Sequence, residues 1–466
     1  MNRIDAIPDD VLLGIFDFYV YVPPSHRVKC KKKVEAWQSL VHVCRRWRNL
    51  VLASPRRLNL RLFCTHETPV KDRLDVWPAL PLIVSGNMES SRSDNVIAAL
   101  GQSNRVCLVN LILKSWSLEK VLGTMQVPFP ELTDLRLSSY APAGPPVILD
   151  SFLDGSAPRL RSFNTHNIIF LGFPKLLLSA NHLIYLALRT NGMPNLGYIS
   201  PEAMIDLLSV LSSLKTLLCL EFRTFQRHPD WDGRSLPPPK HSIPSLREFR
   251  FTGVPKYLEQ VVTHIDAPQL NEMHISFVNQ FNYFDEDFDC PRLAQFINRT
   301  PTLGARDGAH VQFATDDRYT RVTLLACSSA LDILTSCRLA DFVRGFCNSS
   351  LHPLSTVEDL YIRHQRWHSP TQNTAWLQFL LLFTAVKNLY LSKEFAPGVA
   401  GALQELVGGR ITEVLPSLQK IFVEALEPSG SGPFQENIGQ FVAARQLSDH
   451  PVVISDWAKD SKMKLM

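Results

Sequence analysis

A short pattern of alternating apolar residues recurs along most of the chain and constrains its fold more than any other feature. It approximates P-x-L-x-x-L-x-L, and its first apolar positions lie 23 to 34 residues apart, except for one interval of 87. Alternation places the apolar residues on one face of a short strand. The residues between strands supply a helix or a loop, as in the helical pattern of Pro201–Leu214. The nine segments are Pro130–Leu137, Pro158–Thr165, His182–Leu188, Thr216–Phe222, Pro244–Phe251, Pro268–Ile275, Thr356–Ile362, Ala385–Leu391 and Pro416–Val423.

A recurrence of roughly 20 to 30 residues is typical of leucine-rich repeats, whose stacked units share one core. The pattern therefore predicts an α/β repeat fold, an irregular leucine-rich-repeat solenoid with a curved, mainly parallel sheet. The long interval is close to three units, and its candidates for weak units are Pro291–Phe296, His310–Phe313 and Arg321–Leu325. Of the nine units, only one has the Asn that standard repeats carry after the strand, Asn191. An ordinary α/β sheet protein therefore stays open as the alternative.

These patterns divide the chain into four expected parts. Residues 1–55 form a helical module with a basic insertion at 22–35, and residues 56–128 connect it to the solenoid and begin the sheet. Residues 129–426 carry the degenerate repeats, and residues 427–466 form a C-terminal cap or tail.

The first 55 residues have helical periodicity. Residues 4–19 read IDAIPDDVLLGIFDFY, with Pro8 suited to a first helical turn, and helical spacing resumes over Trp37–Leu52 until Pro55. So small a module cannot cover all of its large apolar residues. Part of its apolar face must dock, either on the repeat array as a cap or on another protein.

The ordered pair I-P-D-D-V-L-L-x-I-F and W-x-x-L-V-x-V-C-R-R-W-R-x-L resembles the F-box, the helical module that binds the Skp-type adaptor of SCF ubiquitin ligases. The chain is similar to the expanded F-box families of mushroom-forming fungi, the basidiomycetes. The resemblance implies two sets of residues: Ile7, Pro8, Leu12, Ile15 and Phe16 face the adaptor, and Val43, Cys44 and Trp47 hold the later helices or complete that face. The insertion between the two halves departs from the F-box pattern.

By this resemblance the chain is a substrate-recognition subunit. It would bind a Skp-type adaptor, and through it a cullin-RING scaffold, while the repeats hold an unknown target protein. Catalysis would come from other subunits, so the chain would be no enzyme and would need no catalytic residue, metal or cofactor. Arg and Trp side chains anchor many interfaces; the candidates for target binding are Trp231, Arg363, Arg366 and Trp367.

Charge supports a rival hypothesis. The formal net charge is +4, but the segment Arg27–Arg61 holds eleven Lys and Arg residues and one acid, Glu35. A basic head of this kind is typical of nucleic-acid binding, so a nucleic-acid-binding or scaffold protein without a ubiquitin-ligase role is the alternative. Against nucleic acid, the Ile7–Phe16 segment is apolar and lacks basic residues.

Other classes find no support in the sequence. There is no P-loop, GxSxG, HExxH or kinase signature, and none of the nine cysteines forms a CxxC pair. The longest apolar run, Trp376–Val386, is too short for a bilayer, and acidic residues interrupt any signal peptide near the N-terminus. We expect a soluble protein of a reducing compartment, cytoplasmic or nuclear or both.

Overall fold

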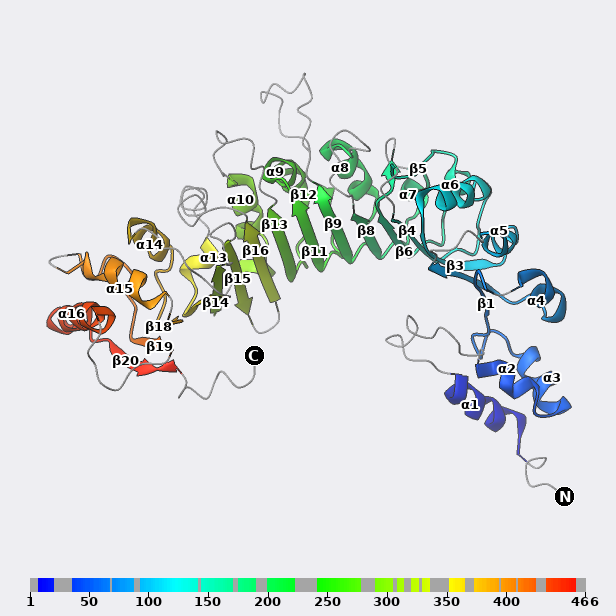
Figure 1. Ribbon diagram of the computed structural model, residues 1–466, viewed down its shortest axis with the longest axis horizontal. Coiled ribbons are helices and arrows are strands. Elements are labelled where there is room, and N and C mark those ends of the chain that lie inside the picture. The colour runs from blue at the N-terminus through cyan, green and yellow to red at the C-terminus, as the bar shows by residue number, and fades with distance from the viewer. Residues whose placement is uncertain are drawn as a thin grey trace. The chain divides into compact units, whose positions relative to one another are not determined.

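The computed structural model has a strand at each of the nine motif segments (Figure 1). It describes residues 7–20, 36–67, 69–87, 93–140, 144–170, 175–189, 199–222, 241–277, 290–304, 308–313, 320–326, 329–335, 352–364, 373–393, 395–407, 410–424 and 433–457. The chain forms two compact units, Met1–Leu183 and Ile184–Met466.

The first unit begins with three helices and continues as alternating strands and helices. Its main strands have the order β1-β2-β3-β4-β6, and every pair of neighbours is parallel. Strands β5 and β7 form a separate parallel pair. The elements are α1 (Asp9–Val20), α2 (Ala36–Val41), α3 (Arg45–Ala53), β1 (Leu62–Cys64), α4 (Val70–Val76), β2 (Leu82–Asn87), α5 (Asp94–Leu100), β3 (Val106–Leu113), α6 (Ser115–Thr124), β4 (Asp134–Ser139), β5 (Val147–Ile148), a short 3-10 helix (Phe152–Gly155), β6 (Ser162–His166), β7 (Ile169–Phe170) and α7 (Lys175–Ser179).

The second unit repeats the same strand–helix alternation. Its main strands have the order β8-β9-β11-β13-β16-β15-β14-β17-β18-β19-β20, and β10 and β12 form a separate parallel pair. The elements are β8 (Tyr185–Arg189), α8 (Pro201–Val210), β9 (Thr216–Phe222), β10 (His241–Ser242), β11 (Glu248–Gly253), α9 (Pro255–His264), β12 (Ile265–Asp266), β13 (Glu272–Phe277), α10 (Pro291–Arg299), α11 (Pro301–Gly304), β14 (Gly308–Phe313), β15 (Thr320–Ala326), β16 (Ser329–Thr335), α13 (His352–Ser355), β17 (Asp359–His364), α14 (Asn373–Leu380), β18 (Asn388–Leu391), α15 (Ala396–Gln404), β19 (Lys420–Val423), α16 (Pro433–Leu447) and β20 (Val453–Asp456).

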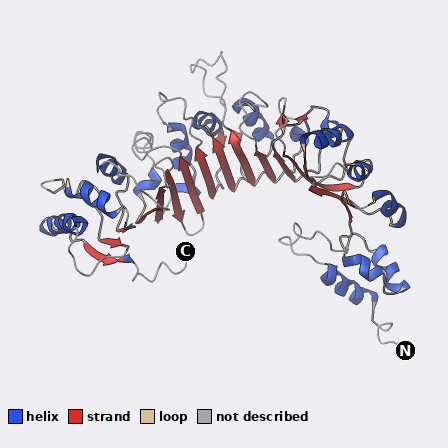
Figure 2. Ribbon diagram, viewed as in Figure 1, coloured by secondary structure: helices blue, strands red, loops and turns tan. Residues whose placement is uncertain are grey.

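Alternation along each strand separates two faces. In β3, Val109, Leu111 and Leu113 are fully buried, whereas Asn110 and Ile112 between them are half-buried. The helices that connect successive strands, such as α5 and α6 in the first unit and α8 and α9 in the second, lie on one side of the strands (Figure 2). The predicted mixed α/β architecture with a large, mainly parallel sheet is confirmed, and the strand–helix alternation is consistent with a leucine-rich-repeat-like fold.

The prediction for the 87-residue interval was wrong in two respects. Segment Pro291–Phe296 lies in helix α10, whose first backbone amides, of Arg292 and Leu293, donate to the Glu259 carboxylate at 2.9 and 2.6 Å. Three strands do fill the interval, but as a meander: β15 is antiparallel to both β14 and β16. The outer strands β16 and β14 remain parallel to β13 and β17, so the meander fits the parallel sheet.

Other polar groups make the hydrogen bonds after the strands that the repeat Asn makes in standard leucine-rich repeats. Asn191 lies outside the described residues. In the first unit the Oγ atoms of Ser115 and Ser139 lie 2.9 Å apart, and the Asn167 side chain donates to the Ser139 carbonyl at 3.2 Å. All three residues are buried, and they lie at or just after the ends of three successive strands, β3, β4 and β6. Hydrogen bonds between successive repeats therefore satisfy buried polar groups that would otherwise be costly.

Near the C-terminus, a buried arginine donates hydrogen bonds to buried backbone carbonyls. Arg445, on α16, has no exposed surface, and its guanidinium donates to the carbonyls of Ile411 and Leu415 at 3.2 and 3.0 Å. Leu415 has a φ of 49°, a region that residues other than glycine seldom adopt. Arg445 thus stabilises the strained turn that leads into β19.

We predict that Arg445→Met lowers the free energy of unfolding by about 2–4 kcal/mol, because buried carbonyls lose the guanidinium as a hydrogen-bond donor. Urea unfolding followed by circular dichroism measures the change. The matched control is Arg410→Met, which removes an exposed arginine that pairs with Glu413 in the same region and leaves the unfolding midpoint nearly unchanged. Equal midpoints for the two variants would contradict this role of Arg445.

Candidate interaction surfaces

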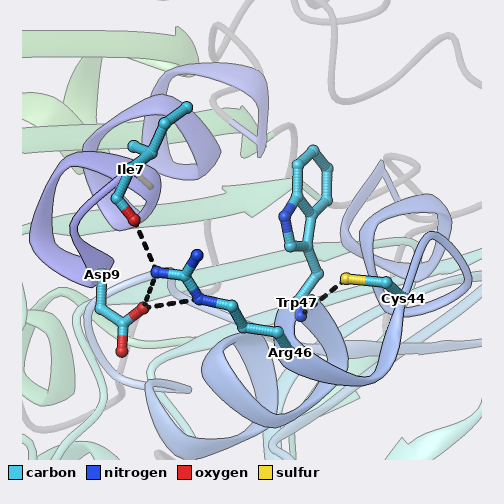
Figure 3. Close-up of polar contacts among 5 residues, drawn as sticks. All are labelled: Ile7, Asp9, Cys44, Arg46 and Trp47. Atoms are coloured by element: carbon cyan, nitrogen blue, oxygen red, sulfur yellow. Dashed lines mark hydrogen bonds and ion pairs between the residues drawn. The ribbon is translucent and has the colours of Figure 1, made fainter. Parts of the chain in front are cut away.

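An arginine clamp attaches α1 to α3 in the N-terminal helical module (Figure 3). The Arg46 guanidinium donates to the Ile7 carbonyl at 2.5 Å and to the Asp9 carboxylate at 2.6 and 3.1 Å. Asp9 is the first residue of α1, where a carboxylate also favours the positive end of the helix dipole. The clamp therefore sets the position at which α1 begins.

Sequence periodicity predicted one helix over Trp37–Leu52, but the structure divides it into α2 and α3. Cys44 lies at the break with extended backbone angles, and its Sγ accepts a hydrogen bond from the Trp47 amide at 3.4 Å. Cys44 thus acts as the N-cap of α3, which starts a new helix at Arg45. The break lets α3 turn and pack on α1.

The side of α1 that faces the module is strongly buried. Leu12 and Phe16 are 1% and 0% exposed, and the rings of Phe16 and Trp47 meet edge to face with centroids 4.7 Å apart. Leu12 and Phe16 were predicted to face an adaptor. Their side chains instead form the interior of the module, with the half-buried Trp47 beside Phe16.

The opposite side of α1 is apolar and exposed. Val11, Ile15, Phe18 and Tyr19 are 48%, 51%, 87% and 53% exposed. Their spacing of four, three and one residues places them on one face of the helix, here called the α1 stripe. This is a substantial exposed apolar surface on a small module, a feature that marks interaction sites.

The predicted adaptor-facing residues are therefore divided. Ile15 belongs to the α1 stripe, and Pro8, Val43 and Cys44 are also exposed, whereas Ile7 is half-buried. Val11, Phe18 and Tyr19, the other members of the α1 stripe, were not among the residues that the sequence predicted to face a partner. Their helical spacing from Ile15 was visible in the sequence, but nothing local distinguished the exposed apolar face from the buried one.

The helical module also packs against the start of the sheet. Trp37, which is 3% exposed, donates its indole N–H to the Arg61 carbonyl at 3.1 Å. Its ring meets that of Trp77 with centroids 5.0 Å apart. Residues on both sides of β1 therefore hold α2 against the start of the sheet. These contacts cover part of the module's apolar surface but do not cover the α1 stripe.

Four arginines are exposed among the described residues of the module and the turn that follows it: Arg45, Arg48, Arg56 and Arg57. Two of them donate to nearby backbone carbonyls, Arg48 to Val41 and Arg57 to Asp10. The basic insertion at 22–35 lies outside the described residues, so the structure places only this part of the basic head.

Of the four candidates for target binding, only Arg363 lies among the described residues; Trp231, Arg366 and Trp367 do not. Arg363 is on β17, on the face of the sheet opposite the buried Leu360 and Ile362. Burial lowers the pKa of its guanidinium, and the charges of Tyr361 and Glu424 oppose that shift.

Four rings stack across the strands beside Arg363. His310, Tyr361, Tyr390 and Phe422 occupy the same register on β14, β17, β18 and β19 and form what we call the aromatic row. Successive ring centroids lie 4.4, 4.2 and 4.4 Å apart, and the planes are within 19° of parallel. Neighbouring strands are about 4.8 Å apart, so equal register brings the rings into stacking distance.

No group of three or more His, Cys, Asp or Glu residues could hold a metal ion within the described ranges. Among the helices that the structure describes, none has the length and apolar character needed to cross a bilayer.

Comparisons with known proteins give little further guidance. No protein-family model matches the chain, and no curated protein matches it. The solved structures similar to it include the leucine-rich repeat-containing protein LegL7 from Legionella pneumophila, which is 14% identical, with 82% of this chain and 97% of that chain covered and a TM-score of 0.26. A TM-score this low carries no argument, so the fold assignment rests on the strands and pairings described above.

We predict that Arg46→Gln loosens α1, because it removes the charged contact to Asp9 and weakens the bond to the Ile7 carbonyl. A partly exposed contact of this kind contributes about 1 kcal/mol, which corresponds to roughly fivefold faster amide exchange in α1. Hydrogen exchange read by mass spectrometry over residues 9–20 measures it. Arg45→Gln, one residue away and exposed, is the control, and equal exchange in both variants would refute the clamp.

A second prediction concerns acid stability. Burial lowers the pKa of His310 from 6.5 to about 4, with a further contribution from Arg363, and its Nε2 is buried without a hydrogen-bond partner. Between pH 6.5 and 4 the histidine is protonated in the unfolded chain but neutral in the folded chain. The free energy of unfolding therefore falls as the pH drops through this range.

Replacing His310 with Phe keeps an aromatic ring at this position of the row and removes the group that titrates. Urea midpoints at pH 7, 5.5 and 4.5 should decline less for His310→Phe than for the wild type. His182→Phe, at an exposed position, should decline as the wild type does. Identical pH profiles for His310→Phe and the wild type would count against the buried neutral histidine.

Proposed function

We propose that the chain is a substrate-recognition subunit of an SCF-type ubiquitin ligase. The α1 stripe carries the proposal: an N-terminal helical module with an F-box-like sequence presents four exposed apolar side chains on its first helix. A Skp-type adaptor would cover this stripe together with Val43, which is 59% exposed, and would connect the chain to a cullin-RING scaffold.

The strand–helix array is the proposed target-binding part. Its face opposite the helices carries polar, charged and aromatic side chains, with Arg363 and the aromatic row toward its C-terminal end. Catalysis in such a ligase depends on proximity, since the receptor holds the target near the ubiquitin-charged enzyme. The proposal gives the chain itself no catalytic residue and no cofactor, and places it in the cytoplasm, the nucleus or both.

The decisive variant is Ile15→Asp/Phe18→Asp. Both side chains are exposed, so the substitutions should leave the fold intact but put two charges on the proposed contact. We expect adaptor binding to weaken at least about 100-fold, as for the loss of central interface anchors. Isothermal titration of the purified chain with a Skp-type adaptor measures the affinity. Leu12→Asp is unsuitable, because a charge at this buried position would unfold the module.

The matched control is Val76→Asp, at a residue of α4 in the same unit that is 72% exposed. It should bind the adaptor as the wild type does. The proposal fails if the wild type does not bind, or if the double variant binds equally well.

The four exposed arginines favour nucleic-acid binding as the second candidate. Retention of the adaptor-free chain on duplex DNA at physiological salt would support it, if retention declines steeply with added salt and is lost in Arg56→Gln/Arg57→Gln. If binding depends on phosphate contacts, Ile15→Asp/Phe18→Asp should be retained on DNA nearly as well as the wild type. The two candidate functions are therefore distinguishable.

A further inference from the structure

Trp457 folds back over the open face of the sheet. It follows β20 directly, yet its ring centroid lies 5.7 Å from that of Tyr390 on β18 and 6.3 Å from that of Tyr361 on β17. In the sheet, β17 is three strands away from β20. With strands about 4.8 Å apart, the Trp457 side chain therefore extends past β19 to reach these rings.

This contact covers the two middle rings of the aromatic row, Tyr361 and Tyr390. Trp457, Tyr390 and Tyr361 are 6%, 2% and 7% exposed and form one cluster, with Phe422 packed against it. The Arg363 guanidinium lies 5.2 Å from the Trp457 ring and 5.8 Å from the Tyr361 ring, distances at which a cation and an aromatic face attract each other. Trp457 therefore occupies a site with aromatic walls and a cation at its border.

Covering the end of the repeat core does not require this tryptophan. Helix α16 already packs on α15, and its Ile438 and Phe441 are 1% and 0% exposed. Trp457 lies on the other face of the sheet, with the aromatic row. Its contacts thus serve a surface that is separate from the apolar core beneath the helices.

The strand that precedes Trp457, β20, has few buried side chains. None of the four residues of β20 is buried, and Val453 is 57% exposed. The buried residues are those at its two ends, Val452 and Trp457. β20 is also the last strand in the sheet order, and short edge strands with few buried contacts are among the first parts of a fold to open.

We propose that Trp457 is an internal ligand of the aromatic row, and that the row binds an extended segment of a target protein that carries a large aromatic side chain. The occupant's chemistry follows from the side chain that sits there, Trp457, and from the Arg363 cation beside its ring. That the occupant belongs to a target protein rests on the proposed function. The existence of the binding site does not depend on it.

An internal ligand lowers the apparent affinity for an external one in proportion to the fraction of time that the site is open. If Trp457 fills the row for nine-tenths of the time or more, removing its side chain raises the affinity of a competing peptide at least about tenfold. A tryptophan with a purely structural role would give no such increase.

The probe is an acetylated, amidated peptide with the sequence of Val452–Trp457 that carries 5-fluorotryptophan. Fluorine NMR then observes only the peptide during titration with the full chain. We expect the peptide to bind Trp457→Ala at least about tenfold more tightly than the wild type. Adding Arg363→Met to Trp457→Ala should weaken binding severalfold, because the cation next to the ring is lost.

The matched control is Trp116→Ala, which removes a tryptophan that is 43% exposed on α6, in the other unit, and should bind as weakly as the wild type. Equal affinity for Trp457→Ala and the wild type, or no binding to a cooperatively folded Trp457→Ala, overturns the proposal. If Trp457→Ala does not unfold cooperatively, Trp457→Leu replaces it and the same outcomes decide. The assay contains no adaptor, so its failure leaves the proposed adaptor contact standing.

Discussion

Both units depend on one constraint: a single repeat cannot bury its own apolar strand face. Each short strand presents two or three apolar side chains on one side, and only the neighbouring strands and the helices above them remove those side chains from water. In-register parallel pairing is the arrangement that aligns these side chains from one repeat to the next, as between β11 and β13 or between β17 and β18. The helices, the turns and the open face are all positioned by this alignment.

The turns between repeats illustrate how the chain meets this constraint without a regular Asn. Buried backbone groups near the strand ends still need partners. Ser115, Ser139 and Asn167 provide them in the first unit, and Arg445 does so near the C-terminus. Because several residue types can perform this function, the repeats keep their geometry while their sequences diverge.

The same stacking gives the open face its character. Rings at one register on adjacent strands are brought within about 4.4 Å of each other, so the aromatic row follows from the pairing that serves the core on the other side. At the N-terminus, exposure depends on the packing of helices and not on strand register. The module packs on the start of the sheet through Trp37 and Trp77 and buries one side of α1, which leaves the α1 stripe as the surface proposed to receive an adaptor.

Periodicity in the sequence was sufficient to locate the nine motif strands, the helix at Pro201–Leu214 and the start of α1 after Pro8, because alternation and helix-start signals act within a few residues. It did not reveal the break at Cys44, the meander of β14 to β16, or which side of α1 is exposed. Each of these depends on contacts between residues far apart in the chain, such as Phe16 with Trp47 and β16 with β13. The sequence by itself determined which residues are apolar and how they repeat. Only the tertiary structure decided which of them are covered, because burial is set by neighbours that local spacing does not specify.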